Sequence, residues 1–147
     1  MRFSAAVLAL SSLLAISFTT AARARVAQDT TKTTWDGVFS ADQAKRGEDQ
    51  YGKSCVSCHG PDLAGLDTAP SLTGPEFNAG WADLTLDDLF ERIRTTMPAD
   101  GPGSLTRDQY VDVLSFLLSK DGFPAGSADL PAENATLKTI KFVVKKP

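Results

Sequence analysis

Both cysteines and the only histidine of the chain stand together, in Cys55-Val56-Ser57-Cys58-His59. Two thiols at this spacing lie about one helical turn apart, so each can add to a vinyl group of the same haem. The residue that follows can then present its imidazole to the iron. The motif therefore predicts covalent attachment of a c-type haem through Cys55 and Cys58, with His59 as an iron ligand.

Other uses of this motif fit the chain less well. A thioredoxin-like dithiol usually lies in a βαβ context, which the flanking sequence lacks. A zinc site needs further ligands, and the chain has two Cys and one His in all. The same scarcity excludes an iron–sulfur cluster held by four thiolates, and any hydrolase of the Ser-His or Cys-His type would have to use His59 as its base.

The second axial ligand of the iron cannot be a histidine, because His59 is the only one. A methionine thioether is the common alternative and raises the reduction potential. Met97, in Thr95-Thr96-Met97-Pro98, is the only methionine besides Met1, and we expect it to bind the iron. Water, a Lys or Asn ligand, or an open site are the alternatives, and most methionines are ordinary core side chains.

The N-terminus predicts an export signal. Met1-Arg2-Phe3 precedes an apolar run that stops at Phe18, and Ala22-Arg23-Ala24 offers a small-x-small cleavage site. The run is shorter than the roughly 20 residues of a membrane-spanning helix. We expect a signal peptide over residues 1–24, a periplasmic mature protein and no membrane span after cleavage.

Cleavage would change the charge of the chain. The formal net charge is −3, and removal of two arginines with no acid makes it −5. This sign argues against nucleic acid as a partner, because nucleic-acid binding requires a basic surface.

Three helices are predicted to hold the candidate ligands. Ser40 with Gln43 predicts a capping box before a helix that runs toward Cys55. A second helix begins after Thr85, and a third begins at a further capping box at Thr106. The second should end near Thr96, because Pro98 disfavours helical geometry at Met97; the third should end at the glycine of Lys120-Asp121-Gly122.

The rest of the chain is predicted to be irregular. Proline and glycine recur from Gly60 to Gly80 and predict a loop, whereas Leu137 to Val144 suggests an extended segment. We divide the chain into the signal peptide, a flexible leader over 25–39, a domain over 40–122 and a C-terminal tail over 123–147. A core of that size is only marginally stable on its own, so we expect a bound cofactor to stabilise it.

The order of capped helix, C-x-x-C-H, Pro/Gly loop, helix, Met-Pro and final aromatic helix resembles a class I (monohaem) cytochrome c over Ser40 to Gly122. Three shorter segments are similar to periplasmic cytochrome c subunits and domains associated with quinoprotein dehydrogenases: Trp35–Phe39, Met97–Gly103 and Gly122–Pro124. The resemblance implies a small all-α fold with about three main helices around one covalent haem c, plus an irregular leader and tail.

The resemblance also implies roles for particular residues. Gly47 and Tyr51 on the first helix would cross Phe116, with Val113, on the last helix. This close approach would explain a glycine inside a helix.

Near the haem, the carbonyl of Pro70 would accept the Nδ1 proton of His59, and Leu72 would pack on the haem face. Pro61 competes for the first role, but it lies only two residues after His59. Trp81 or Tyr51 could reach a haem propionate, although core burial is the plainer interpretation of both.

The function implied is the transfer of single electrons, not an enzymatic reaction, because two filled axial positions leave no place for a substrate. The partners would be redox proteins, with a quinoprotein dehydrogenase and a terminal oxidase as candidates. One alternative is an electron-transfer subunit of a quinoprotein dehydrogenase complex. The other is a ligand-binding or catalytic haem protein with an open sixth position.

Overall fold

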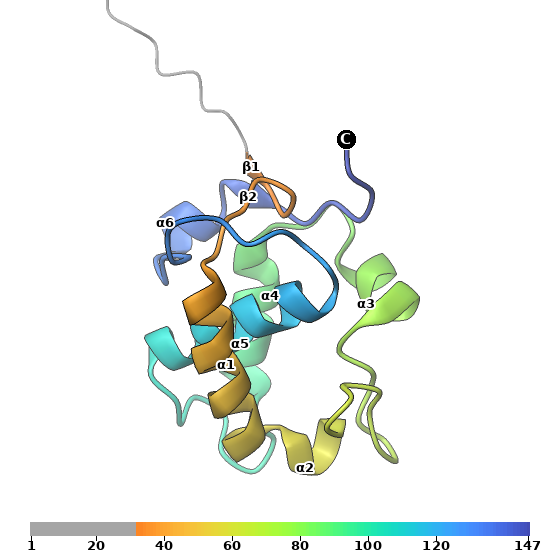
Figure 1. Ribbon diagram of the computed structural model, residues 1–147. Coiled ribbons are helices and arrows are strands. Elements are labelled where there is room, and N and C mark those ends of the chain that lie inside the picture. Colours follow the sequence, from red (N-terminus) through yellow and green to blue (C-terminus); the bar gives the residue numbers. More distant parts are fainter. Residues whose placement is uncertain (1–31) are drawn as a thin grey trace, which may run out of the picture.

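The computed structural model describes residues 32–147, and helices dominate that part of the chain (Figure 1). The long helices are α1 (Ala41–Ser54), α4 (Leu86–Thr96) and α5 (Arg107–Lys120). The shorter ones are α2 (Val56–His59), α3 (Gly74–Trp81) and α6 (Asn134–Leu137). The all-α architecture is therefore confirmed. The expected signal peptide over 1–24, and the leader before residue 32, lie outside the described residues.

Two short strands complete the fold. β1 (Lys32–Thr33) pairs in parallel with β2 (Ile140–Lys141), with Lys32 opposite Ile140. In the described region, 32–147, no helix combines the length and apolar character needed to cross a bilayer.

The long helices begin at the predicted caps. The hydroxyls of Ser40, Thr85 and Thr106 each accept a backbone N–H three residues on. The boxes at Thr85 and Thr106 are reciprocal, but the one at Ser40 is half made. The side chain of Gln43 instead pairs with the backbone of Leu130, donating to its carbonyl at 2.9 Å and accepting its N–H at 2.6 Å. The predicted reciprocal box at Ser40 is wrong because Gln43 is buried and anchors the tail.

Helices α1 and α5 cross at Gly47 (Figure 1). A Cβ atom at this position would overlap the carbonyl of Asp112 and lie 2.8 Å from the Cβ of Phe116. One turn along α1, the rings of Tyr51 and Phe116 pack with centroids 5.3 Å apart. The crossing has the form that the resemblance implied, since only glycine lets the two backbones come this close.

The loop predicted for Gly60 to Gly80 is wrong over its last third, where α3 forms. Pro75 occupies the first turn of this helix, where its fixed φ and missing N–H are favourable. The carboxylate of Asp121 accepts the N–H of Gly74 at 2.8 Å, and Phe77 is buried in the core. A proline that suggested a break is thus a helix start.

Residues 32–39 are not a flexible leader, because they pack on the fold. Thr34 and Phe39 are fully buried. The indole N–H of Trp35 donates to the carbonyl of Val143 at 2.8 Å, and its ring meets Phe123 edge-on at 5.0 Å. These contacts join the leader to the tail, a pairing between distant segments that local sequence patterns do not reveal.

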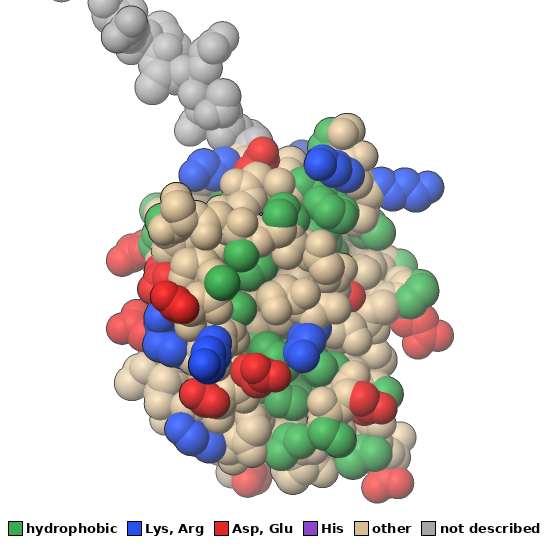
Figure 2. All heavy atoms as spheres, in the orientation of Figure 1, with side chains coloured by type: hydrophobic (Ala, Val, Ile, Leu, Met, Phe, Trp, Pro, Cys, Tyr) green, Lys and Arg blue, Asp and Glu red, His purple; other side chains and the backbone are tan. Residues whose placement is uncertain are grey.

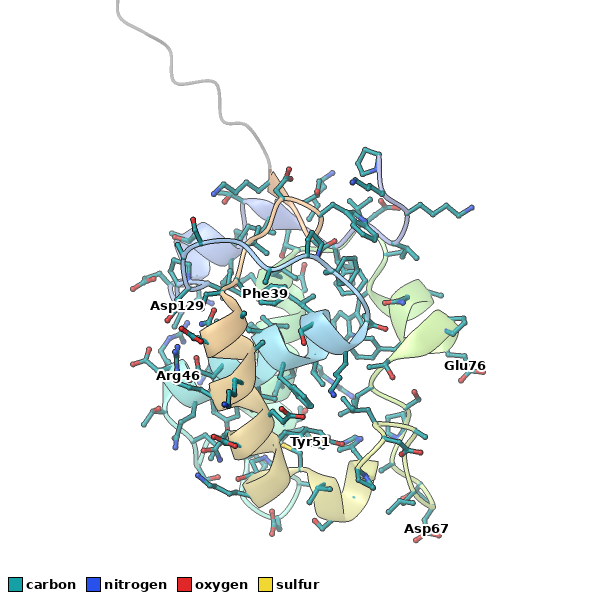
Figure 3. All side chains as sticks on the ribbon, viewed as in Figure 1. Phe39, Arg46, Tyr51, Asp67, Glu76 and Asp129 are labelled. Carbon is teal, nitrogen blue, oxygen red and sulfur yellow. The ribbon has the colours of Figure 1, made fainter. Side chains whose placement is uncertain are left out.

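The tail also differs from the expectation of one extended segment. Within 137–144 only β2 is a strand, and α6 precedes it. Leu137, Ile140 and Phe142 are buried. Earlier in the tail, Asp129 binds Arg46 of α1 at 2.7 Å (Figure 3). The core therefore draws on segments outside residues 40–122.

Candidate cofactor site

A cavity of about 980 Å³ lies among α2, α3, α4 and α5 and the loops after α2 and α4. Its volume is at the upper end of the range for small-molecule and cofactor sites. All six candidate site residues border it: Cys55, Cys58, His59, Pro70, Leu72 and Met97. Figure 2 shows hydrophobic side chains gathered at the lower end of the molecule, where α2 and the loop after it lie in Figure 1.

The two thiols are placed by the junction of α1 and α2. Cys55 closes α1, and its carbonyl accepts the N–H groups of Cys58 and His59 at 3.2 and 3.0 Å. Both thiols are free, with Cys55 half-buried and Cys58 exposed. Burial, and secondarily the neighbouring Cys58, raise the pKa of Cys55 to about 11. The Cys55 side chain is therefore a protonated thiol at neutral pH.

The imidazole of His59 is buried, with its Nδ1 atom 3.0 Å from the carbonyl oxygen of Pro70. This contact is a hydrogen bond only when Nδ1 carries the proton, and in that tautomer Nε2 keeps its lone pair. Such a bond fixes the ring and makes Nε2 a better metal ligand. The carbonyl in contact belongs to Pro70 and not to Pro61.

Gly65 allows the loop to return to His59. Its N–H donates to the carbonyl of His59 at 2.9 Å, and its φ is +82°. A Cβ atom there would overlap the carbonyl of Ala69 and lie 2.8 Å from the carbonyl carbon of Pro70. Glycine is thus required both for the backbone conformation and for the approach of Pro70.

Helix α4 and the residue after it supply another wall of the cavity. Leu89, Ile93 and Met97 recur every four residues on its cavity side. The N–H of Met97 donates to the carbonyl of Ile93 at 2.8 Å, and the backbone of Met97 is extended. The chain therefore leaves the helix directly at Met97.

Sequence reasoning missed Arg92, which also borders the cavity. It lies three residues after Leu89 on α4, but that spacing alone does not show which side of the helix borders a cavity. In the region from 32 to 147, no carboxylate lies within ion-pair distance of its guanidinium. Helix α3 was missed, and with it Phe77, which borders the cavity together with Trp81.

Tyr51 borders the cavity as well, but its hydroxyl already has a partner. It donates to the carbonyl of Gly60 at 2.6 Å, and burial raises its pKa to about 12. Its hydroxyl therefore holds α1 against the end of α2.

The donors around the cavity fit a haem better than a bare metal ion. Nowhere in the described part of the chain do three His, Cys, Asp or Glu side chains converge as a metal site. One imidazole, one thioether and two thiols instead border one large cavity, a set of donors that suits a haem.

Comparisons with known proteins agree with this fold. Residues 42–117, just over half of the chain, match the family model described as cytochrome c oxidase, cbb3-type, subunit III. None of the curated proteins matches the sequence.

Among solved structures, a chain in the crystal structure of the sulfane dehydrogenase SoxCD from Paracoccus pantotrophus is similar, with a TM-score of 0.50 and 21% sequence identity. The match covers 74% of this chain and 61% of that chain, so the present protein spans less than two thirds of its length. At this identity the likeness shows the fold.

Proposed function

Because the chain belongs to the cytochrome c family matched over residues 42–117, we propose that it carries single electrons between redox proteins through one covalently bound haem, ligated by His59 and Met97. Its fold is that of a small class I monohaem cytochrome c, and the family implies haem c and electron transfer. When bound, the haem supplies the one-electron Fe(III)/Fe(II) couple.

The observation that carries this proposal is the convergence of both thiols, His59 and Met97 on one cavity. The S–H groups of Cys55 and Cys58 would each add across a vinyl group, sulfur to carbon and hydrogen to the other carbon, and tether the cofactor. His59, oriented by Pro70, would offer Nε2 to the iron, and Met97 its thioether. Leu72 would exclude water from the haem face.

Arg92 has a role in this proposal that the sequence did not suggest. A guanidinium at the border of an apolar cavity, with no carboxylate partner among residues 32–147, is suited to an anion. We assign it to a haem propionate. An unpaired propionate stabilises the oxidised, more positive iron. Pairing its charge with the guanidinium would therefore favour the reduced iron and raise the reduction potential.

The proposed setting is the periplasm, reached through a signal peptide over residues 1–24. The partners would be redox proteins, a quinoprotein dehydrogenase and a terminal oxidase among them. With a net charge of −5 after cleavage, the protein would be steered toward a basic surface on its partner. A reaction rate that does not fall with added salt would contradict this steering.

The test of the proposal is covalent haem content combined with a redox titration. The wild-type protein, produced with the cytochrome c maturation machinery, should keep one haem per chain after denaturation, and its absorbance should titrate as a one-electron couple. Cys55→Ser combined with Cys58→Ser should lose the covalent haem. Ser57→Ala, inside the same motif, is the matched control and should keep it. A haem that dissociates from denatured wild-type protein would refute the attachment.

A second candidate function is that of an electron-transfer subunit in a dehydrogenase complex. It is favoured by the likeness to a chain from a sulfane dehydrogenase structure and by the segments similar to cytochromes of quinoprotein dehydrogenases. Co-purification with a large dehydrogenase subunit from periplasm would support it. A protein isolated alone that exchanges electrons with separate partners would favour the free carrier.

A further inference from the structure

The hydroxyl of Tyr110 joins the two ends of the loop that carries Met97. Tyr110 lies on α5 and is 1% exposed. Its hydroxyl donates to the carbonyl of Met97 at 2.7 Å, at the start of the loop. It also accepts the N–H of Leu105 at 3.5 Å, a longer and weaker contact at the end of the loop. One buried hydroxyl therefore closes the segment from Met97 to Leu105.

The rest of this loop is held by contacts within itself. The N–H of Gly101 donates to the carbonyl of Pro98 at 2.9 Å, and that of Ser104 to the carbonyl of Gly101 at 3.1 Å. Asp100, the glycine at 103 and Ser104 are exposed. These turns shape the loop but do not attach it to a helix.

The backbone of Met97 is thus fixed on both sides by groups outside the loop. Its N–H is bound to Ile93 on α4, and its carbonyl to Tyr110 on α5. A side chain can hold a metal only as firmly as its own backbone is held. The hydroxyl of Tyr110 therefore helps to fix the position of the Met97 thioether.

We propose that Tyr110 is a positioning residue for the Met97 ligand, its hydroxyl holding the Met97 carbonyl so that the thioether stays in the cavity. This inference rests on the proposed function, because it takes Met97 as the axial ligand. Without the hydroxyl, the ligand loop detaches more readily, and a competing ligand for the iron binds more tightly.

The test compares Tyr110→Phe with Tyr51→Phe in the ferric holoprotein. Both substitutions keep the ring and remove a buried hydroxyl that donates to a backbone carbonyl, at 2.7 Å and 2.6 Å respectively. Only the first of these carbonyls belongs to the Met97 loop. Imidazole, which competes with Met97 for the iron, should bind Tyr110→Phe about tenfold more tightly than wild type, the size expected for one lost hydrogen bond. It should bind Tyr51→Phe within twofold of wild type.

A purely structural role for Tyr110 predicts a different pattern, with a lower unfolding temperature and unchanged imidazole affinity. That result would overturn the proposal, and so would an equal gain in Tyr51→Phe. In a Met97→Ala background no ligand remains to be positioned, so adding Tyr110→Phe should leave imidazole affinity unchanged. If instead wild type binds imidazole as readily as Met97→Ala, the proposed ligation by Met97 fails, which is a distinct outcome.

A measurement on the wild-type protein covers the case in which Tyr110→Phe does not fold. Saturation with imidazole should release Met97, shift the ring resonances of Tyr110 and speed hydrogen exchange at the amide of Leu105, while the ring of Tyr51 responds less. An unchanged Tyr110 ring and Leu105 amide after imidazole binding would overturn the proposal.

Discussion

Gly65 and Pro70 touch so closely that no side chain fits between them: a Cβ atom on Gly65 would lie 2.8 Å from the carbonyl carbon of Pro70. The same carbonyl group faces Nδ1 of His59 at 3.0 Å. The orientation of the candidate iron ligand therefore depends on a glycine six residues farther along the chain.

Gly65→Ala should push Pro70 away from His59 and lower the reduction potential or the yield of the holoprotein. Gly122→Ala is the matched control, because Gly122 has a similar φ of +84° but open space around its Cα. The strain of positive φ, about 1 kcal/mol, is common to both variants, so the difference between them reports the lost contact. Equal potentials and equal haem yields in the two variants would contradict this role. Redox titration provides the measurement.

Gly47→Ala should destabilise the crossing of α1 and α5 by about 2 kcal/mol or more, because the new methyl group overlaps the carbonyl of Asp112. Gly52→Ala, on the same helix, meets nothing within 4 Å. There the higher helix propensity of alanine should stabilise the protein by up to about 1 kcal/mol. Urea unfolding would measure both, and a stable Gly47→Ala protein would refute the tight crossing.

These helices illustrate what could be predicted from sequence. The caps at Thr85 and Thr106, and the end of α4 at Thr96, were predictable because each depends on residues within one turn. The contact of Gly47 and Tyr51 with Phe116 could be predicted only from the family resemblance, because the resemblance indicated which helix crosses the first one.

The expectations that failed depend on contacts between distant segments. Gln43 has the sequence position of a capping residue, but it binds the backbone of Leu130. Thr34 ends a polar, Thr-rich stretch and Trp35 follows it, yet both side chains donate to the carbonyl of Val143. No local pattern encodes such partners. Helix α3 was missed for another reason, because Pro75 is equally compatible with a turn and with a helix start.

At the site, the candidate haem-binding residues were recognisable by type and spacing: Cys55, Cys58, His59 and Met97. Arg92 and Tyr110 were not, because an arginine or tyrosine on a helix carries no signal of what it faces. Their positions on the cavity and beneath the Met97 loop emerge only from the packing of α4 against α5.

Asp121→Asn should change the pH dependence of stability. Burial raises the pKa of Asp121 above its ordinary value, although bonds from Gly74 and Asn78 oppose this. A raised pKa means that the fold favours the protonated carboxyl group. The stability that the protonated group contributes is fully present below the unfolded pKa of 3.8, and it is lost as the pH rises through the folded pKa. The amide stays neutral throughout.

Relative to wild type, Asp121→Asn should therefore gain stability between pH 3 and pH 7. The new N–H donor would also serve the side-chain oxygen of Asn78, which is buried without a partner, as is the second carboxylate oxygen of Asp121. Urea unfolding at the two pH values is the measurement. Parallel stability curves for the two proteins would show that Asp121 is not destabilised by its charge.

Removal of the cofactor should unfold much of the domain. A cavity of about 980 Å³ would be left in a small core, and the cofactor's binding free energy is part of the folding free energy. The protein with Cys55→Ser and Cys58→Ser, freed of haem, should lose much of its helical circular dichroism and its cooperative urea transition. An apoprotein that unfolds at the same urea concentration as the holoprotein would contradict a role for the cofactor in holding the fold.

The central claim, that Met97 fills the sixth coordination position of a haem held by Cys55, Cys58 and His59, is tested most directly by the absorption spectrum of the oxidised protein. We predict a weak sulfur-to-iron charge-transfer band in the red, which Met97→Ala abolishes while it opens the reduced iron to carbon monoxide. A wild-type protein that lacks this band, has high-spin iron and binds carbon monoxide readily would contradict the claim and indicate a ligand-binding or catalytic haem protein instead.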